Sequence, residues 1–223
     1  PLEEPVLMQL AGCSPTEMAE AAKLNADRGA AIIDINMGCP VKKVVNGHAG
    51  SALMRDEVHA AKILEATVKA VKLPVTLKMR TGWDLANRNA PNLARIAEES
   101  GIKLLTVHGR TREQGYKGQA EYDTMALIKS RVQIPVVANG DIDSPHKARD
   151  VLRQTGADAV SHGATGKGND QVRFELGYYA LEPGIRVIAP WREWKLTSRE
   201  TLLKYAEKHG IPVEMKKKKG SPY

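Results

Sequence analysis

The stretch Ile32–Lys43, IIDINMGCPVKK, decides the fold of this chain. It reads as a buried apolar strand that runs directly into a Gly-Cys-Pro turn, with two lysines close behind. A lone cysteine is usually a small buried hydrophobic residue. Cys39 instead follows the end of the strand, where parallel α/β proteins carry their reactive groups, so we predict a functional thiol. Cys13 has no such cluster around it and is predicted to be structural.

The segments on both sides of this stretch alternate between strand-like and helical patterns. Short connections between them indicate parallel α/β architecture, in which the carboxyl ends of all strands meet on one face. The predicted strands are Leu7–Leu10, Ala31–Ile35, Val75–Met79, Leu104–Val107, Pro135–Ala138 and Ala157–Val160. The predicted helices are 16–27, 56–71, 89–100, 144–155 and a last one that begins at Asn169 or Asp170 and runs through Tyr179.

Five consecutive predicted strands end in polar or glycine-rich clusters, whereas the bodies of the strands are apolar. The clusters are Gln9, Asn36–Pro40, Lys78–Gly82, His108–Arg112 and Asn139–Asp141. One polar strand end is ordinary, but five in a row predict the rim of an active site at the carboxyl ends of a (β/α) barrel.

Four motifs in register then resemble the tRNA-dihydrouridine synthases, especially their bacterial B-type branch. They are DINMGCPVKKV, LKMRTGWD, VHGRTREQGYKGQAEYD and VVANGDI, and the resemblance covers residues 2–155. It implies an FMN-type (β/α)8 TIM barrel, of which about six βα units are present. It also implies an enzyme that takes hydride from NADPH and reduces uridine to 5,6-dihydrouridine in tRNA.

The resemblance assigns roles to individual residues. Cys39 is expected to be the general acid that protonates the uracil ring, a role suited to a thiol placed over the ring. Asn46 and His48 lie in the loop that closes over the substrate in the family. Arg110 and Arg112 are either phosphate or substrate contacts or solvated side chains. The expected FMN contacts are Gln9, Lys78, His108, Asn139, Gly140, Asp141 and Gly163.

The last part of the chain has a different composition. Only three aromatic residues precede Gly156, and the other seven follow it. Here Gly163–Glu175, GATGKGNDQVRFE, resembles argininosuccinate synthase, an ATP-dependent ligase of citrulline and aspartate, and Ala164 stands where the first family has an arginine. The resemblance implies that Thr165, Asn169 and Asp170 meet aspartate, that Asn169 and Arg173 meet citrulline, and that Gly163 meets the nucleotide.

Two resemblances in one chain lead us to expect a chimera. A partial dihydrouridine synthase barrel (residues 1–155) would be joined to an α/β segment of a nucleotide-binding ligase domain (residues 156–223) within Thr155–Val160. The leading hypothesis is the flavin-dependent reductase. A ligase-type binding fragment and a fusion without function are the alternatives, and the spacing of the loop around Lys167 does not match a P-loop.

Composition limits the remaining classes of protein. No apolar run approaches the length of a membrane span, and the opening PLEEP has no feature of a signal peptide, so we expect a cytoplasmic protein without a membrane partner. Two cysteines favour reduced thiols over a disulfide scaffold, and no metal site is predicted. The net charge of +7 is only weak support for RNA binding, because the run Lys216–Lys219 is typical of a solvated tail.

Overall fold

The computed structural model describes residues 6–164 and 169–189, which divide into two compact units. Of the described residues, the first unit holds 6–143 together with Asp150–Ala157. The second holds Ser144–Arg149, 158–164 and 169–189. The boundary predicted after Thr155 stays a prediction, because a division based on contacts assigns no ancestry to either unit.

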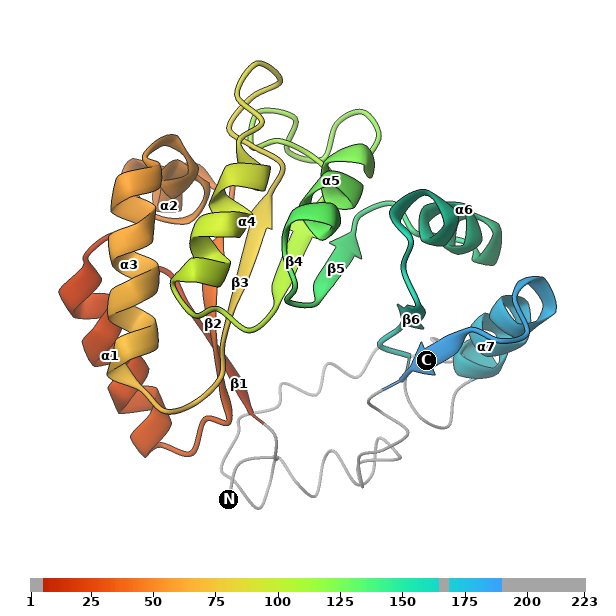
Figure 1. The fold of residues 1–223 in the computed structure, drawn as a ribbon, viewed down its shortest axis with the longest axis horizontal. Coiled ribbons are helices and arrows are strands. Elements are labelled where there is room, and N and C mark those ends of the chain that lie inside the picture. The colour runs from red at the N-terminus through yellow and green to blue at the C-terminus, as the bar shows by residue number, and fades with distance from the viewer. Residues whose placement is uncertain (1–5, 165–168, 190–223) are drawn as a thin grey trace, which may run out of the picture. The chain divides into compact units, whose positions relative to one another are not determined.

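The first unit alternates strands with helices along its whole length (Figure 1). Its elements are β1 (Leu7–Leu10), α1 (Pro15–Asp27), β2 (Ile32–Met37), α2 (Lys42–Asn46), the 3₁₀ helix η1 (Gly50–Arg55), α3 (Glu57–Ala70), β3 (Val75–Arg80), α4 (Ala90–Glu99), β4 (Leu105–His108), α5 (Asp123–Arg131) and β5 (Val136–Asn139). Helix α6 (Pro145–Thr155) contributes to both units.

The five strands of this unit form one parallel sheet in the order β1-β2-β3-β4-β5. Every crossover leads to the adjacent strand, as in a (β/α) barrel, and crossovers of one hand place their helices on one face of the sheet. Figure 1 shows α3, α4 and α5 on the same face. The parallel α/β class predicted from the sequence is therefore confirmed, and so are its first five strands, to within two residues at their ends.

Alternation along the strands separates the two faces of this sheet. The helix side holds the fully buried apolar core, for which Ile33, Ile35 and Met37 pair in register with Val75, Leu77 and Met79. The residues between them face the other way and are mostly polar, with Leu7, Ile32 and Val137 as the apolar exceptions. From β1 to β5 the polar residues are Gln9, Asp34, Asn36, Thr76, Lys78, Arg80, Thr106, His108 and Asn139.

The second unit contains a small parallel sheet of its own. Strand β6 (Ala159–Ser161) pairs with β7 (Arg186–Ile188), and α7 (Asn169–Leu181) connects them. The sequence predicted that the strand near Ala157–Val160 would continue the series of barrel strands. Within the second unit β6 pairs with β7, and the expectation that β6 continues the series of barrel strands stays a prediction. Three residues supply few ladder hydrogen bonds, so the partner of such a strand is set by packing.

Candidate active site at the carboxyl ends of the strands

The loop that carries Cys39 is held at both of its peptide groups. The Asn36 side-chain oxygen accepts hydrogen bonds from the backbone N–H of Cys39 (2.9 Å) and of Gly38 (3.2 Å). The carbonyl oxygen of Cys39 accepts two more, from the Ser51 hydroxyl (2.9 Å) and the Ser51 N–H (3.1 Å). The position of the half-buried thiol is therefore set by the end of β2 and by η1, not by the turn alone.

Gly50 makes the close return of the chain to Cys39 possible. Its φ is +60°, and a Cβ built on it would lie 2.9 Å from the Cys39 carbonyl oxygen and 3.1 Å from the Cys39 Cβ. A side chain at this position would both strain the backbone and push the cysteine loop away. His48 precedes this return and also has a positive φ, of 56°.

Arg80, at the end of β3, connects the cysteine loop to the loop after β4. Its Nε donates to the Gly38 carbonyl (2.8 Å), and its Nη1 donates to the carbonyls of Thr111 (3.1 Å) and Gly115 (2.8 Å). The side chain is buried and also lies against the Tyr116 ring, 5.6 Å from its centroid. Burial lowers the pKa of the guanidinium from its ordinary value. Arg80 is thus a cross-link between two loops of the site.

Gln9, predicted as a flavin contact, has its amide orientation fixed by neighbouring strands. Its Nε2 donates to Asp34 Oδ2 (2.6 Å), and its Oε1 accepts from Asn36 Nδ2 (2.9 Å). The other oxygen of Asp34 accepts from the Thr76 hydroxyl (2.6 Å). Because one of the two amide hydrogens of Gln9 remains available, the side chain can still donate to a ligand in a fixed direction.

Asn139 brings two further predicted residues together. Its Oδ1 accepts from Lys78 Nζ (3.3 Å) and contacts His108 Nδ1 (3.0 Å). Burial lowers the pKa of Lys78, an effect that Asp34 partly offsets and Arg80 reinforces. Among the described residues no carboxylate lies within ion-pair distance of the Lys78 ammonium. This cation therefore has the surroundings expected of a group that meets an anionic ligand.

The protonation of His108 follows from its neighbours. Burial lowers its pKa, the hydrogen bond to Asn139 acts in the opposite direction, and the charges of Arg80, Lys78 and Arg110 lower it further. The neutral ring then has one donor and one acceptor. Asn139 Oδ1 can only accept, and Arg110 Nη1, 3.4 Å from Nε2, can only donate. The proton is therefore assigned to Nδ1.

Asp141 and Arg110 form an ion pair. Arg110 Nη2 donates to Asp141 Oδ2 at 2.7 Å, and the same oxygen accepts from the Ala120 N–H at 2.7 Å. The backbone hydrogen bond from Ala120 is the largest cause of the lowered pKa of Asp141, and Arg110 adds to it. Arg110, one of the two possible phosphate contacts, is thus buried and engaged within the protein. Gly140, beside Asp141, has a φ of +120°.

The other predicted residues belong to the second unit. Gly163 follows β6 and has nothing within 4 Å of a Cβ built on it. Asn169 and Asp170 begin α7, where Arg173 Nη1 lies 3.8 Å from Asp170 Oδ1 and both side chains are largely exposed. Thr165 lies outside the described residues. The roles predicted for these positions stay predictions.

Comparison with known proteins identifies the family. The family model described as dihydrouridine synthase (Dus) matches residues 1–176 of the 223 residues. The chain belongs to the dihydrouridine synthase (Dus) family. This membership confirms the resemblance carried by the four motifs of residues 2–155.

Two curated relatives show how far the likeness to the Dus family extends. The chain is 59% identical to "tRNA-dihydrouridine synthase B" of Xanthomonas axonopodis pv. citri over 176 residues, which is 79% of the chain and 53% of that protein. It is 50% identical to "tRNA-dihydrouridine synthase B" of Pseudomonas aeruginosa over 218 residues, which is 96% of the chain and 66% of that protein. The chain thus spans between about half and two thirds of the length of these relatives.

These matches bear on the expected chimera. The Dus match continues to residue 176, and the Pseudomonas alignment covers nearly the whole chain. Both extend past the junction predicted within Thr155–Val160. The ligase-like segment therefore receives no support from the comparisons.

Solved structures add information on the fold alone. "N-acetylneuraminate lyase" of Mycoplasma synoviae has a TM-score of 0.54 at 15% identity, over 82% of the chain and 61% of that protein. "Dipeptide Epimerase" of Enterococcus faecalis has a TM-score of 0.54 at 14% identity, over 83% of the chain and 45% of that protein. Within the described residues, no helix is long and apolar enough to span a membrane.

Sequence reasoning missed the residues that hold the site in place. Asn36 and Arg80 were seen only as parts of polar strand ends, and Ser51 and Asp34 were not considered. One signal was available, because an asparagine two residues before Gly38 matches the spacing of an Asx turn. The contacts of Arg80, Asp34 and Ser51 cross between elements distant in the sequence, so no local pattern could predict them.

Proposed function

We propose that this chain carries the site at which uridine in tRNA is reduced to 5,6-dihydrouridine, with FMN as cofactor and NADPH as reductant. One observation carries the proposal: a positioned thiol, Cys39, shares the carboxyl-end face of the sheet with Gln9, Lys78, His108 and Asn139. Family membership and the two synthase relatives support the reaction class.

The donor set on this face fits a flavin. The half-buried Lys78 ammonium, without a carboxylate partner among the described residues, suits the pyrimidine edge, where negative charge collects on reduction. Gln9 and Asn139 present amide groups held by neighbouring strands, and His108 presents a neutral ring. Gly140 and Asp141 are proposed for the ribityl side.

FMN, once reduced by NADPH, would supply the hydride that adds to C6 of the uracil ring. Negative charge then develops on C5 and the carbonyl oxygens, and C5 requires a proton. We assign this proton to the Cys39 thiol, whose S–H bond breaks as the new C5–H bond forms. The thiolate left behind regains its proton from water. The hydrogen bond that the Cys39 N–H donates to Asn36 and the one that its carbonyl accepts from Ser51 keep the sulfur at one position during this transfer.

The test uses the full chain and the variant Cys39→Ala. Flavin binding and its reduction by NADPH, followed by absorbance, are expected to be unchanged, because neither needs the thiol. Formation of dihydrouridine in a tRNA transcript is expected to fall by about 10²- to 10⁴-fold, the usual contribution of a general acid.

Cys13→Ala is the matched control, since it removes the other thiol of the chain. The backbone carbonyl of Cys13 contacts the His59 ring and none of the residues assigned to the site. It is expected to leave all three measurements unchanged. Normal dihydrouridine formation by Cys39→Ala would remove the assigned role. Absence of bound flavin from the wild-type chain, even with added FMN, would contradict the whole proposal.

No arrangement of Asn169, Asp170 and Arg173 favours the alternative, ligation of citrulline and aspartate with ATP, so we propose no ligase activity.

A further inference from the structure

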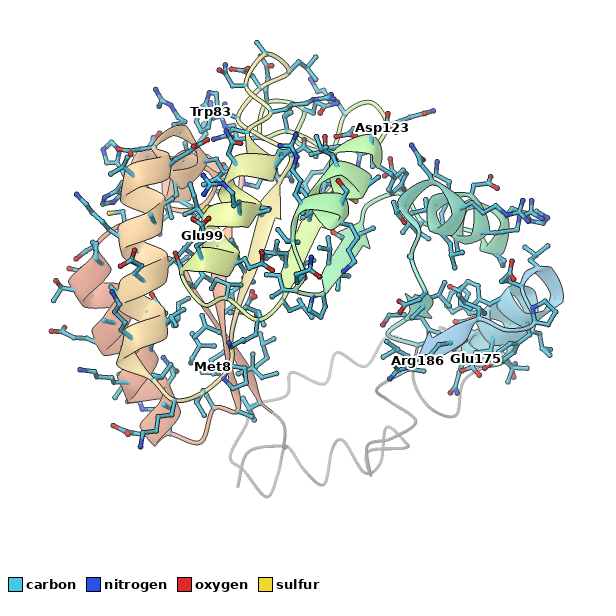
Figure 2. The ribbon with its side chains drawn as sticks, in the orientation of Figure 1. Met8, Trp83, Glu99, Asp123, Glu175 and Arg186 are labelled. Atoms are coloured by element: carbon cyan, nitrogen blue, oxygen red, sulfur yellow. The ribbon has the colours of Figure 1, made fainter. Side chains whose placement is uncertain are left out.

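A pocket lies in the first unit, beside the cysteine loop, and none of the residues assigned a step in the proposed reaction lines it. Its volume is about 830 Å³, within the range of sites that hold a whole small ligand. Its walls come from α2, η1, the start of α3 and the loops after β3 and β4. Polar and charged side chains dominate it: Asn46, His48, Arg55, Asp56, His59 and Arg112, together with Trp83, which Figure 2 labels.

Two arginines lie against the indole ring of Trp83. The guanidinium carbon of Arg55 is 4.8 Å from the ring centroid, and that of Arg112 is 4.5 Å from it. Stacking on an aromatic face restrains a guanidinium but leaves the N–H donors at its edge available. Two like charges next to one ring are costly unless an anion binds between or beside them.

Asp56 is the one carboxylate among the described residues that line the pocket, and it forms no ion pair with either arginine. Neither Arg55 nor Arg112 has a side-chain hydrogen bond or a carboxylate within ion-pair distance among the described residues. Asp56 lies in the same pocket, but one of its oxygens caps helix α3 by accepting from the His59 N–H at 2.9 Å. The ring of His59 is also engaged, through Nε2 at 2.7 Å from the Cys13 carbonyl. The two arginines are therefore left to an external partner.

The pocket is built from the same segments that position Cys39. Helix η1 contains Ser51, which holds the Cys39 carbonyl, and ends at Arg55. Trp83 follows Arg80, whose Nε binds the carbonyl next to Cys39. The Arg112 N–H in turn donates to the Gly82 carbonyl at 2.9 Å. A ligand held by this pocket thus has a fixed relation to the thiol.

We infer that this pocket binds a phosphate-bearing nucleotide of an RNA strand, next to the uridine presented to Cys39. Arg55 and Arg112 donate to phosphodiester oxygens, and Trp83 holds the two guanidinium groups in place. The inference rests on the proposed function for the identity of the strand. A polynucleotide fits better than an isolated anion, because the pocket is large and lies beside the reacting position. NADPH also carries phosphate groups, so it is the competing ligand for this pocket.

The test compares Arg55→Gln and Arg112→Gln with the full wild-type chain. Binding of a tRNA transcript is measured by fluorescence anisotropy at several salt concentrations, without turnover. Each variant is expected to bind about tenfold more weakly at 0.1 M salt, and the slope of log K against log [salt] is expected to fall by about 1. In parallel, KM for NADPH is measured from the rate of flavin reduction and is expected to be unchanged.

Arg28→Gln is the matched control, because Arg28 is an exposed arginine that follows the end of α1 and contributes nothing to the pocket. It is expected to bind as the wild type does. Thermal melting of all variants checks that they fold.

Unchanged RNA affinity and salt slope in both pocket variants would overturn the inference, as would a wild-type chain that binds no RNA. A raised KM for NADPH with unchanged RNA affinity would assign the pocket to the reductant instead. Pocket-dependent RNA binding without dihydrouridine formation would contradict the proposed function and leave this inference standing.

Discussion

At the residue scale, the reactivity expected of Cys39 depends on one asparagine. Asn36 lies at the point where β2 passes into the cysteine loop, and its side-chain oxygen accepts two backbone N–H groups of that loop. The same side chain donates to Gln9, on the flavin side of the site. Asn36 therefore connects the position of the proposed acid to that of the proposed cofactor contact.

Replacement of Asn36 by alanine is expected to loosen the cysteine loop. Two N–H groups lose their acceptor, at a net value of about 1 kcal/mol per hydrogen bond. The rate of alkylation of Cys39 by iodoacetamide, measured by mass spectrometry, is expected to rise by roughly fivefold or more, whereas that of Cys13 is unchanged. Asn25→Ala, which removes an asparagine that bonds only within α1, serves as the control. Equal rates of Cys39 alkylation in the wild type and in Asn36→Ala would show that the turn is rigid without the Asn36 side chain.

At the element scale, local sequence signals set where α1 and α3 begin. Ser14 precedes α1 with its hydroxyl accepting from the Glu17 N–H at 3.3 Å, and Pro15 occupies the first turn, where proline is favoured. Asp56 caps α3 in the same way. By contrast, α2, η1 and α5 were not predicted, because they are short or weakly patterned and are held by contacts with the rest of the unit.

Ser14→Ala is expected to lower the free energy of unfolding by about 1 kcal/mol, since the first turn of α1 loses its side-chain acceptor. Urea denaturation followed by circular dichroism measures the change. Ser14→Asp retains an acceptor at the same position and is expected to stay close to the wild type. If both variants lose the same stability, the contribution of Ser14 is not that of a cap.

At the scale of the whole molecule, the two units differ in how well their strands are buried. Strands β2 and β3 lie inside the five-stranded sheet, and their apolar residues other than Ile32 are buried. Strands β6 and β7 have three residues each and are largely half-buried or exposed. Local opening of a segment is easier where few apolar contacts are lost.

Hydrogen exchange of the full chain is therefore expected to separate the two sheets. The amides of β2 and β3 should exchange only through global unfolding, and those of β6 and β7 should exchange faster by at least tenfold through local opening. Mass spectrometry of peptic fragments measures both sets in one sample. Equal protection of the two sheets would mean that they unfold as one cooperative body.

The sequence by itself determined the class of fold, the order of the first five strands, and the family. It could do so because strand periodicity, helix caps and the motif after each strand are local, and each can be read in a short window. It also placed Gln9, Cys39, Lys78, His108 and Asn139 at one end of the sheet, since parallel strands present their carboxyl ends together.

Only the tertiary structure decided which face of the sheet these residues share, what holds them, and what remains free. The alternation of β2 and β3 becomes a polar face only once the helices cover the other one. Arg110 and Arg112 look alike in the sequence, yet the first is paired with Asp141 and the second lies on Trp83. The partner of β6 was likewise decided by packing. Each of these outcomes depends on contacts between segments far apart in the chain, which no local pattern specifies.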